Sequence, residues 1–177
     1  KRVLDRIEEL GFDTVVLSEA DTKNGAVENR EDAKKNAQLF KENANKIDGI
    51  IVSLPNFGDE KSVAETIRLA EMDKPILVHG FPDDFEKMDV HNRGDAFCGK
   101  LSVCNNLYQY GFPFSNTALH VEDPDSPEFE ADVKRFARTC KVVNGLKNAR
   151  LGSIGARVTP FNTVRYSEKR LEREGIA

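Results

Sequence analysis

Short apolar runs alternate with amphipathic segments along this chain, and that alternation limits its fold more than any other feature. Three continuous apolar runs have the character of buried parallel strands: 13–17, 48–54 and 75–79. Apolar residues at helical spacing fill the segments before and between them: 1–10, 31–46 and 59–71. Helices and strands that alternate at this pitch form right-handed βαβ units. The sequence therefore predicts an α/β fold, a doubly wound, flavodoxin-like parallel sheet with helices on both faces.

The order of elements also bears on domain organisation. A parallel sheet of this type begins with a strand, whereas this order begins with a helix, so we expect a first strand upstream or one supplied from elsewhere. The later elements that we expect alternate between helix and strand: 95–110, 117–121, 126–144, 149–154 and 159–175. We therefore expect an N-terminal domain over 1–124, followed over 125–177 by a connecting helix and the opening of a second α/β domain.

Two of the expected helices carry apolar stripes. In the helix over 95–110, one face holds four apolar residues, which are Phe97, Leu101, Cys104 and Tyr108. Ser126 before Pro127 is typical of an N-cap followed by the first helical residue. The inner face of that helix is predicted to consist of Phe129, Val133, Phe136, Cys140 and Val143.

Composition and charge narrow the class of protein. The chain has 177 residues, with 26 Lys and Arg, 30 Asp and Glu, and a formal net charge of −4. This balance argues against general binding to nucleic acid or to an anionic membrane, because both need a basic excess. No apolar run approaches the roughly 20 residues that span a bilayer, and the chain shows no signal-peptide pattern. The odd number of cysteines, 3, favours reduced thiols in a cytoplasmic protein.

Ligands of open parallel sheets bind beyond the carboxyl ends of the strands. Three loops qualify by this rule, which are 55–59, 80–94 and the loop after Val121, and the first two carry candidate residues. The loop over 80–94 is long and ends in Arg93-Gly94-Asp95, directly before a helix. Arg and Asp side chains, together with the unpaired N–H groups of a helix N-terminus, bind polyols and other oxygen-rich ligands. The alternative interpretation is that Asp95 is an N-cap and Arg93 a solvated charge.

The other loop contains Asn56 and Phe57, which have the composition of a sugar contact, one amide and one apolar face. An Asx-type turn with Phe57 packed locally is the alternative. Gly152 and Gly155 resemble a phosphate-binding turn, although a tight turn between a strand and a helix is favoured.

No catalytic centre emerges from the residue types and their spacing. The histidines lack metal-ligand spacing, and His79, at a strand end, is expected to be buried with its hydrogen bonds satisfied. The cysteines lie on apolar helix faces and are expected to be buried, inert thiols: Cys98, Cys104 and Cys140. The residues alone therefore predict a polar ligand crevice.

Three stretches together resemble a known family: the residues SLPNFGDE over 53–60, RGDAFCGKLSVCNNL over 93–107 and GSIGARV over 152–158. They are similar to the N-terminal half of the L-fucose/L-arabinose isomerase-like sugar isomerases. The order of helices and strands is similar to that of the family over most of the chain. The specific sequence motifs are confined to these three stretches.

The resemblance implies a homo-oligomeric, three-domain subunit that interconverts aldoses and ketoses with a divalent metal, usually Mn²⁺. It implies that the metal ligands and catalytic acids lie outside this chain, and that the first domain lends sugar-binding loops to a neighbouring subunit. The carry-over gives Arg93 and Asp95 as substrate-binding residues, and the loop with Asn56 and Phe57 corresponds to one that stacks an aromatic ring on the sugar in fucose isomerases. Lys100, one turn into the helix, is the fifth expected substrate-binding residue, which would neutralise the substrate or pair with Asp95 across the turn. In arabinose isomerases a His-Gly-Asp turn sits where this sequence has Arg93-Gly94-Asp95. The Arg in place of that His favours a charged sugar derivative as the ligand.

Two further hypotheses remain open. A small-molecule (sugar) binding α/β module without chemistry fits the same crevice. A nucleotide or flavin carrier is favoured only by the turn at Gly152.

Overall fold

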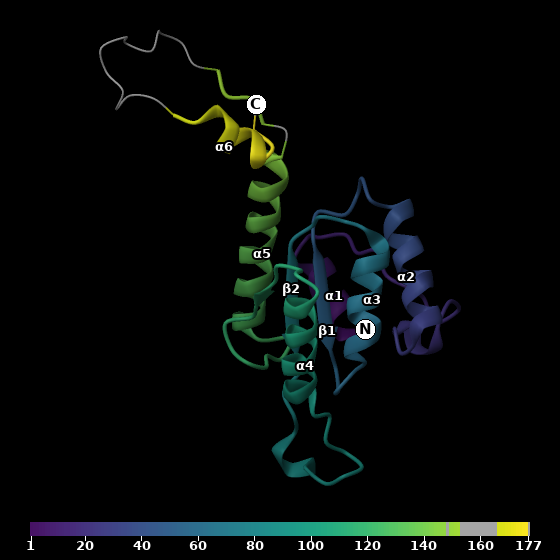
Figure 1. The fold of residues 1–177 in the computed structure, drawn as a ribbon. Coiled ribbons are helices and arrows are strands. Elements are labelled where there is room, and N and C mark those ends of the chain that lie inside the picture. Colours follow the sequence, from purple (N-terminus) through teal and green to yellow (C-terminus); the bar gives the residue numbers. More distant parts are fainter. Residues whose placement is uncertain (148, 153–165, 177) are drawn as a thin grey trace.

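The computed structural model describes residues 1–147, 149–152 and 166–176, and its centre is a parallel sheet between two layers of helices (Figure 1). The strands are β1 (Ile50–Leu54), β2 (Ile76–Gly80) and β3 (Ser115–Asn116), and β2 lies between the other two. All pair in parallel, with Ile50 opposite Ile76 and Leu77 opposite Ser115. The predicted α/β class with a parallel sheet is confirmed.

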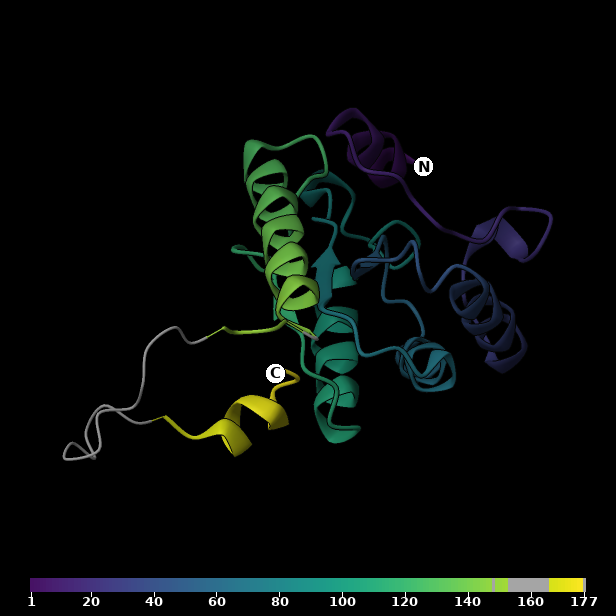
Figure 2. The ribbon, with the colours of Figure 1, turned by 90° about the horizontal axis from the view of Figure 1, so that it is seen from above.

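Helices cover both faces of the sheet. The helices on one face are α2 (Arg30–Glu42), α3 (Glu60–Ala70) and α4 (Ala96–Gln109). The helices on the opposite face are α1 (Arg2–Glu9) and α5 (Pro127–Leu146), as the view from above shows (Figure 2). The remaining helices are the short η1 (Lys23–Gly25), η2 (Phe85–Lys87) and α6 (Glu168–Arg173).

Side-chain caps explain where several helices begin. Asp59 accepts a hydrogen bond from the backbone N–H of Ser62 at 2.8 Å, which caps α3. Ser126 likewise accepts from the N–H of Phe129 at 3.1 Å, with Pro127 at the first helical position. The start predicted for this helix is therefore confirmed.

Alternate residues of the strands supply a separate core to each layer. Toward α3 and α4, the largest cluster contains Ile50, Leu54, Ile67, Ile76, Val78, Ala96, Val103 and Leu107. Toward α5, Leu77 packs with Phe136, Cys140 and Ile51. The predicted inner face of α5 is confirmed for its four buried members, Phe129, Val133, Phe136 and Cys140.

Two predicted strands are wrong. Segment 13–17 is not a strand, because its backbone groups form no hydrogen bonds with a neighbouring strand among the described residues. The strand predicted over 117–121 is replaced by β3, which lies earlier, since after Thr117 the backbone bends into a loop held by buried side chains. Of the strand predicted over 149–154, the described residues 149–152 are not a strand. The rest of that segment, and the start of the last predicted helix, lie outside the described residues.

The apolar stripe of α4 faces solvent. Phe97, Leu101 and Tyr108 are 41%, 57% and 78% exposed. The buried face instead consists of Ala96, Gly99, Lys100, Val103 and Leu107. Gly99 faces inward because α4 lies very close to the loop after β1 at this residue. A Cβ atom on Gly99 would lie 1.8 Å from the carbonyl oxygen of Phe57.

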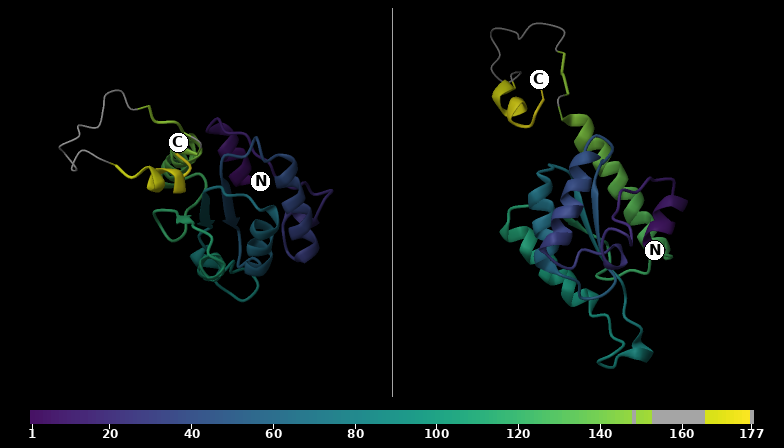
Figure 3. Two further views of the ribbon diagram at one scale, coloured as in Figure 1. Left: turned by 45° about the horizontal axis from the view of Figure 1, so that its top comes forward. Right: turned by 90° about the vertical axis from the view of Figure 1, so that its right-hand side faces the viewer.

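The loop between β2 and α4 projects from the carboxyl end of the sheet (Figure 3, right). It carries η2 and exposes Phe85 and Val90, which are 89% and 77% accessible. Within the described part of the chain, no helix combines the length and the apolar character needed to cross a membrane.

Candidate sugar-binding site

Two loops meet where β1 and β2 end. In the loop after β1, the Oδ1 atom of Asn56 accepts a hydrogen bond from the N–H of Gly58 at 3.1 Å. Gly58 has a positive φ of 73°, so this is the Asx-type turn that the sequence left open. Phe57 does not pack locally, since it is 44% exposed. The turn therefore presents an aromatic ring at the edge of the sheet.

The turn Arg93-Gly94-Asp95 is held by a residue that sequence reasoning missed. Oδ1 of Asp83 accepts hydrogen bonds from the N–H groups of Gly94 and Asp95, at 2.6 and 3.2 Å. Asp95 has a left-handed backbone, and its side chain makes no capping bond to α4. Its Oδ2 instead pairs with Nε of Arg93 at 2.9 Å. Asp83 therefore occupies two N–H groups that the sequence had offered to a ligand.

The two loops are in close contact. A Cβ atom on Gly94 would lie 3.3 Å from the carbonyl oxygen of Pro55, so the backbones pass at near van der Waals distance. Four of the five predicted site residues line one cavity of about 1570 Å³ that extends along β1; these are Asn56, Phe57, Arg93 and Asp95. The structure thus brings together residues that are separated by 36 or more positions in the sequence.

Lys100, the fifth predicted residue, lies elsewhere. Its side chain is buried, and Nζ donates to Oγ1 of Thr117 at 2.7 Å and to the carbonyl oxygen of His120 at 3.0 Å. Burial lowers the pKa of this ammonium group. The predicted alternative pairing with Asp95 is not formed, because Asp95 pairs with Arg93. In the structure Lys100 anchors the loop after β3.

His79 is buried with both ring nitrogens bonded, as predicted. Nε2 lies 2.8 Å from the carbonyl oxygen of Glu122, and Nδ1 lies 3.0 Å from Oγ of Ser53. Because a carbonyl can only accept, Nε2 carries the proton and Nδ1 accepts from the Ser53 hydroxyl. Burial lowers the pKa of His79, which keeps the ring neutral. The imidazole therefore ties β1 and β2 to the loop after β3.

Two buried carboxyl groups lie behind the site, on the loop after β3 and on α5. Glu122 accepts from the N–H of Leu119 at 2.9 Å, and Asp132 accepts from that of Ala118 at 2.5 Å. Asp132 also pairs with Arg135 at 2.6 Å. Burial, followed by the nearby Asp132 carboxylate, raises the pKa of Glu122. No spacing rule pointed to this pair, since its members are brought together only by the fold.

The described residues also bear on the expectations for metal ligands and for thiols. Among the described residues, no three His, Cys, Asp or Glu side chains are grouped so that they could hold a metal ion. The expectation of buried thiols is confirmed for Cys140, whose burial raises its pKa to about 11. It is wrong for Cys98, which is exposed because the stripe of α4 faces solvent. Cys104 is half-buried, and burial raises its pKa as well.

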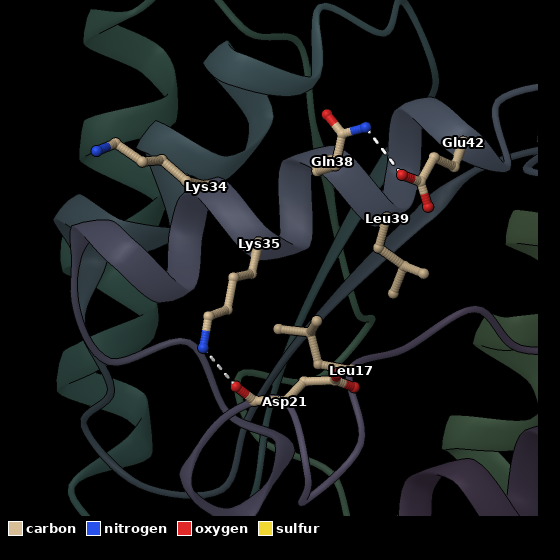
Figure 4. A pocket seen from close by; sticks show the side chains of 7 residues that line it. All are labelled: Leu17, Asp21, Lys34, Lys35, Gln38, Leu39 and Glu42. Carbon is tan, nitrogen blue, oxygen red and sulfur yellow. Dashed lines mark hydrogen bonds between the residues drawn. The ribbon is translucent and has the colours of Figure 1, made fainter.

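A second cavity lies between α2 and the segment that carries Leu17 and Asp21 (Figure 4). Its polar side chains already have hydrogen-bond partners. Nε2 of Gln38 donates to Glu42 at 2.9 Å, and Nζ of Lys35 donates to the carbonyl oxygen of Asp21 at 2.7 Å. Its volume is about 540 Å³. Because these groups already have partners, the edge of the sheet is the better candidate site.

Comparison with known families gives a direct match. A family model described as the fucose/sulfoquinovose isomerase N-terminal domain matches residues 1–147. The chain belongs to this family. No curated protein and no solved structure matches it.

The resemblance to fucose isomerases that the motifs predicted is therefore confirmed. The match to the fucose/sulfoquinovose isomerase N-terminal domain ends at residue 147, directly after α5. It contains both loops of the candidate site. The turn at Gly152 and Gly155, which favoured a nucleotide or flavin carrier, follows the match, and Gly155 lies outside the described residues.

Proposed function

We propose that this chain is the N-terminal part of a metal-dependent isomerase that interconverts an aldose and a ketose, and that its two loops bind the sugar. The observation that carries the proposal is that Asn56 and Phe57 lie beside Arg93 and Asp95 within a domain of the fucose/sulfoquinovose isomerase family. By the same resemblance, the loops serve the active site of a neighbouring subunit in a cytoplasmic homo-oligomer.

Each side chain at this edge has a distinct use in sugar binding. The Asn56 amide and the Asp95 carboxylate bond to hydroxyl groups, and the exposed Phe57 ring covers an apolar face of the sugar. Arg93 is 48% exposed, and beyond Nε its guanidinium has no bonding partner among the described residues. Lys100 lies outside the sugar contacts that we propose, because its Nζ is bonded within the domain.

The sugar that fits Arg93 best carries an anionic group. A guanidinium binds oxyanions through paired, charge-assisted hydrogen bonds. The family description names both fucose, a neutral sugar, and sulfoquinovose, a sulfonated sugar. We therefore favour a sulfonated or otherwise anionic aldose as the substrate of this protein.

The divalent metal, for which we expect Mn²⁺, is held outside this chain in our proposal. When bound, such an ion polarises the sugar oxygens during proton transfer. The described residues offer no set of ligands for it. The part of this chain is to bind and orient the sugar.

The experiment is a substitution in the complete enzyme that contains this domain. Arg93→Gln is expected to lower kcat/KM for an anionic aldose by about 10- to 100-fold, the loss of one or two charge-assisted hydrogen bonds. Its metal content and its kcat/KM for a neutral aldose should stay close to those of the wild type. Lys87→Gln, an exposed change in the same loop, is the matched control.

Two outcomes contradict the proposal. Loss of bound metal in Arg93→Gln would mean that the loop is structural. If the wild-type enzyme turns over no aldose while still binding sugars, the non-catalytic binding module is the better description.

A further inference from the structure

Asp83 fastens the two ends of the loop between β2 and α4, which projects from the sheet (Figure 3, right). Its Oδ1 atom accepts from the N–H groups of Gly94 and Asp95, which follow it by 11 and 12 positions in the sequence. Among the described residues, the side chains of two other loop acids, Asp84 and Asp89, bond only to residues two or three positions away. Asp83 therefore closes the loop, whereas those acids shape only its tip.

Asp95 has a backbone conformation that is uncommon for its residue type. Its φ of 53° and ψ of 28° lie in the left-handed region, which residues with a Cβ seldom adopt. An Asp at the start of a helix is more often an N-cap, with an extended backbone and a carboxylate that accepts from the first N–H groups of the helix. Asp95 makes no such bond to α4. Its own N–H instead donates to Asp83, and this bond stabilises the left-handed conformation.

The conformation of Asp95 decides where its carboxylate lies. Oδ2 of Asp95 pairs with Nε of Arg93 at 2.9 Å. Because a guanidinium has five N–H groups, a bond at Nε leaves both terminal nitrogens of Arg93 for a ligand. A carboxylate that capped α4 would no longer hold the guanidinium, and Arg93 would lose this orientation.

The closed end of the loop also fits tightly against the loop after β1. A Cβ atom on Gly94 would lie 3.2 Å from Oδ1 of Asp83. It would also lie 3.3 Å from the carbonyl oxygen of Pro55 and 3.7 Å from Cα of Asn56. The bonds to Asp83 therefore help to set the spacing between the two halves of the candidate site.

We propose that Asp83 is a positioning residue for the candidate sugar site. Its Oδ1 atom selects the conformation in which Asp95 pairs with Arg93, over the one in which Asp95 caps α4. Asp83 contacts no sugar itself and acts through the turn 93–95. Its role in sugar binding rests on the proposed function, whereas the choice between the two conformations of Asp95 rests on the fold alone.

Amide hydrogen exchange in the complete enzyme that contains this domain tests the conformational step. In Asp83→Ala, exchange at Gly94 and Asp95 is expected to quicken by about tenfold or more, because both N–H groups lose their acceptor. Exchange at Phe97 or Cys98, in the first turn of α4, should slow, because Asp95 becomes the N-cap and accepts from one of them. Asp83→Asn keeps an oxygen acceptor and should exchange like the wild type.

Kinetics on the same variants test the role in sugar binding. Asp83→Ala is expected to raise KM for an anionic aldose by about tenfold with little change in kcat, because contacts made equally in the ground state and the transition state are disturbed. Asp83→Asn should restore the KM of the wild type. Asp84→Ala is the matched control, since it removes an exposed acid from the same loop without touching the turn.

Three outcomes overturn the proposal. The first is wild-type exchange at the turn in Asp83→Ala. The second is equal damage by Asp83→Asn and Asp83→Ala, because the charge and not the acceptor atom would then matter. The third is a lower melting temperature of Asp83→Ala with unchanged KM, which would make Asp83 purely structural. A wild-type enzyme that turns over no aldose contradicts the proposed function instead, and the exchange data still decide the conformational step.

Discussion

At the scale of single residues, the least expected feature is the pair of acids behind the candidate site. Glu122 and Asp132 are 3% and 2% exposed, and one carboxylate oxygen of Glu122 has no hydrogen-bond partner among the described residues. Two buried carboxylates repel each other, so the protonated form of Glu122 is favoured. Lys100 offsets this only in part, since burial and Asp132 together outweigh its effect on the pKa of Glu122.

Glu122→Gln is therefore expected to stabilise the protein at neutral pH. The raised pKa means that the stability contributed by protonated Glu122 is complete below its ordinary pKa of 4.5 and is lost as pH rises through the folded-state value. Glutamine keeps an acceptor for Leu119 without the charge. We expect a melting temperature higher by about 2–4 °C at pH 8, the effect of about 1 kcal/mol, and no gain near pH 4.

The matched control is Glu19→Gln, an exposed residue that should shift the melting temperature little at either pH. A lower melting temperature for Glu122→Gln at pH 8 would show that Glu122 is stabilising as a carboxylate.

Single residues also show how far sequence reasoning reaches at the site. The rule that ligands bind beyond the carboxyl ends of strands predicted Asn56, Phe57, Arg93 and Asp95 as site residues. The fold places all four around one cavity. The rule gave no sign of Asp83, because its role depends on how an irregular loop folds back onto Gly94. Whether these residues bind sugar stays a prediction.

At the scale of elements, apolar runs and caps located the helices and the two longer strands, and the errors have physical causes. A strand exists only when a neighbour pairs with it, and segment 13–17 has an apolar pattern but no pairing neighbour in the described part of the chain. On α4, hydrophobicity favoured burial of the larger side chains. The close approach to Phe57 admits no Cβ at Gly99, and this fixes which face of the helix is inward.

Gly99→Ala tests this packing. The added Cβ would lie 1.8 Å from the Phe57 carbonyl oxygen, so α4 and the loop after β1 must move apart. We expect a loss of about 1–3 kcal/mol in the free energy of unfolding, the usual cost of overpacking. Chemical denaturation measures it.

Gly145→Ala is the matched control, because it makes the same change in α5, where no described atom outside the surrounding helix turns lies within 4 Å of the new Cβ. It should stabilise the protein by up to about 1 kcal/mol through helix propensity. Equal effects of the two substitutions would contradict the close packing of α4.

At the scale of the whole molecule, one surface stands out by its lack of charge. Between Ala96 and Val121, Lys100 is the only Asp, Glu, Lys or Arg, and it is buried. The exposed residues of α4 are Phe97, Cys98, Leu101, Asn105, Tyr108 and Gln109. Interface cores are depleted in charge and enriched in aromatic residues. Two copies of a chain with net charge −4 meet most easily where neither carries charge, so we propose that the expected homo-oligomer forms through this face.

Leu101→Glu should therefore break the association of two copies. It places a carboxylate in the middle of the α4 face, where the twofold symmetry of a dimer would bring two such charges together. Sedimentation analysis of the 177-residue chain should show a dimer for the wild type and a monomer for the variant. Val142→Glu on the outer side of α5 is the matched control, since Val142 and Leu101 are 59% and 57% exposed. A monomeric wild type, or equal mass for the two variants, would mean that a second copy does not cover this face.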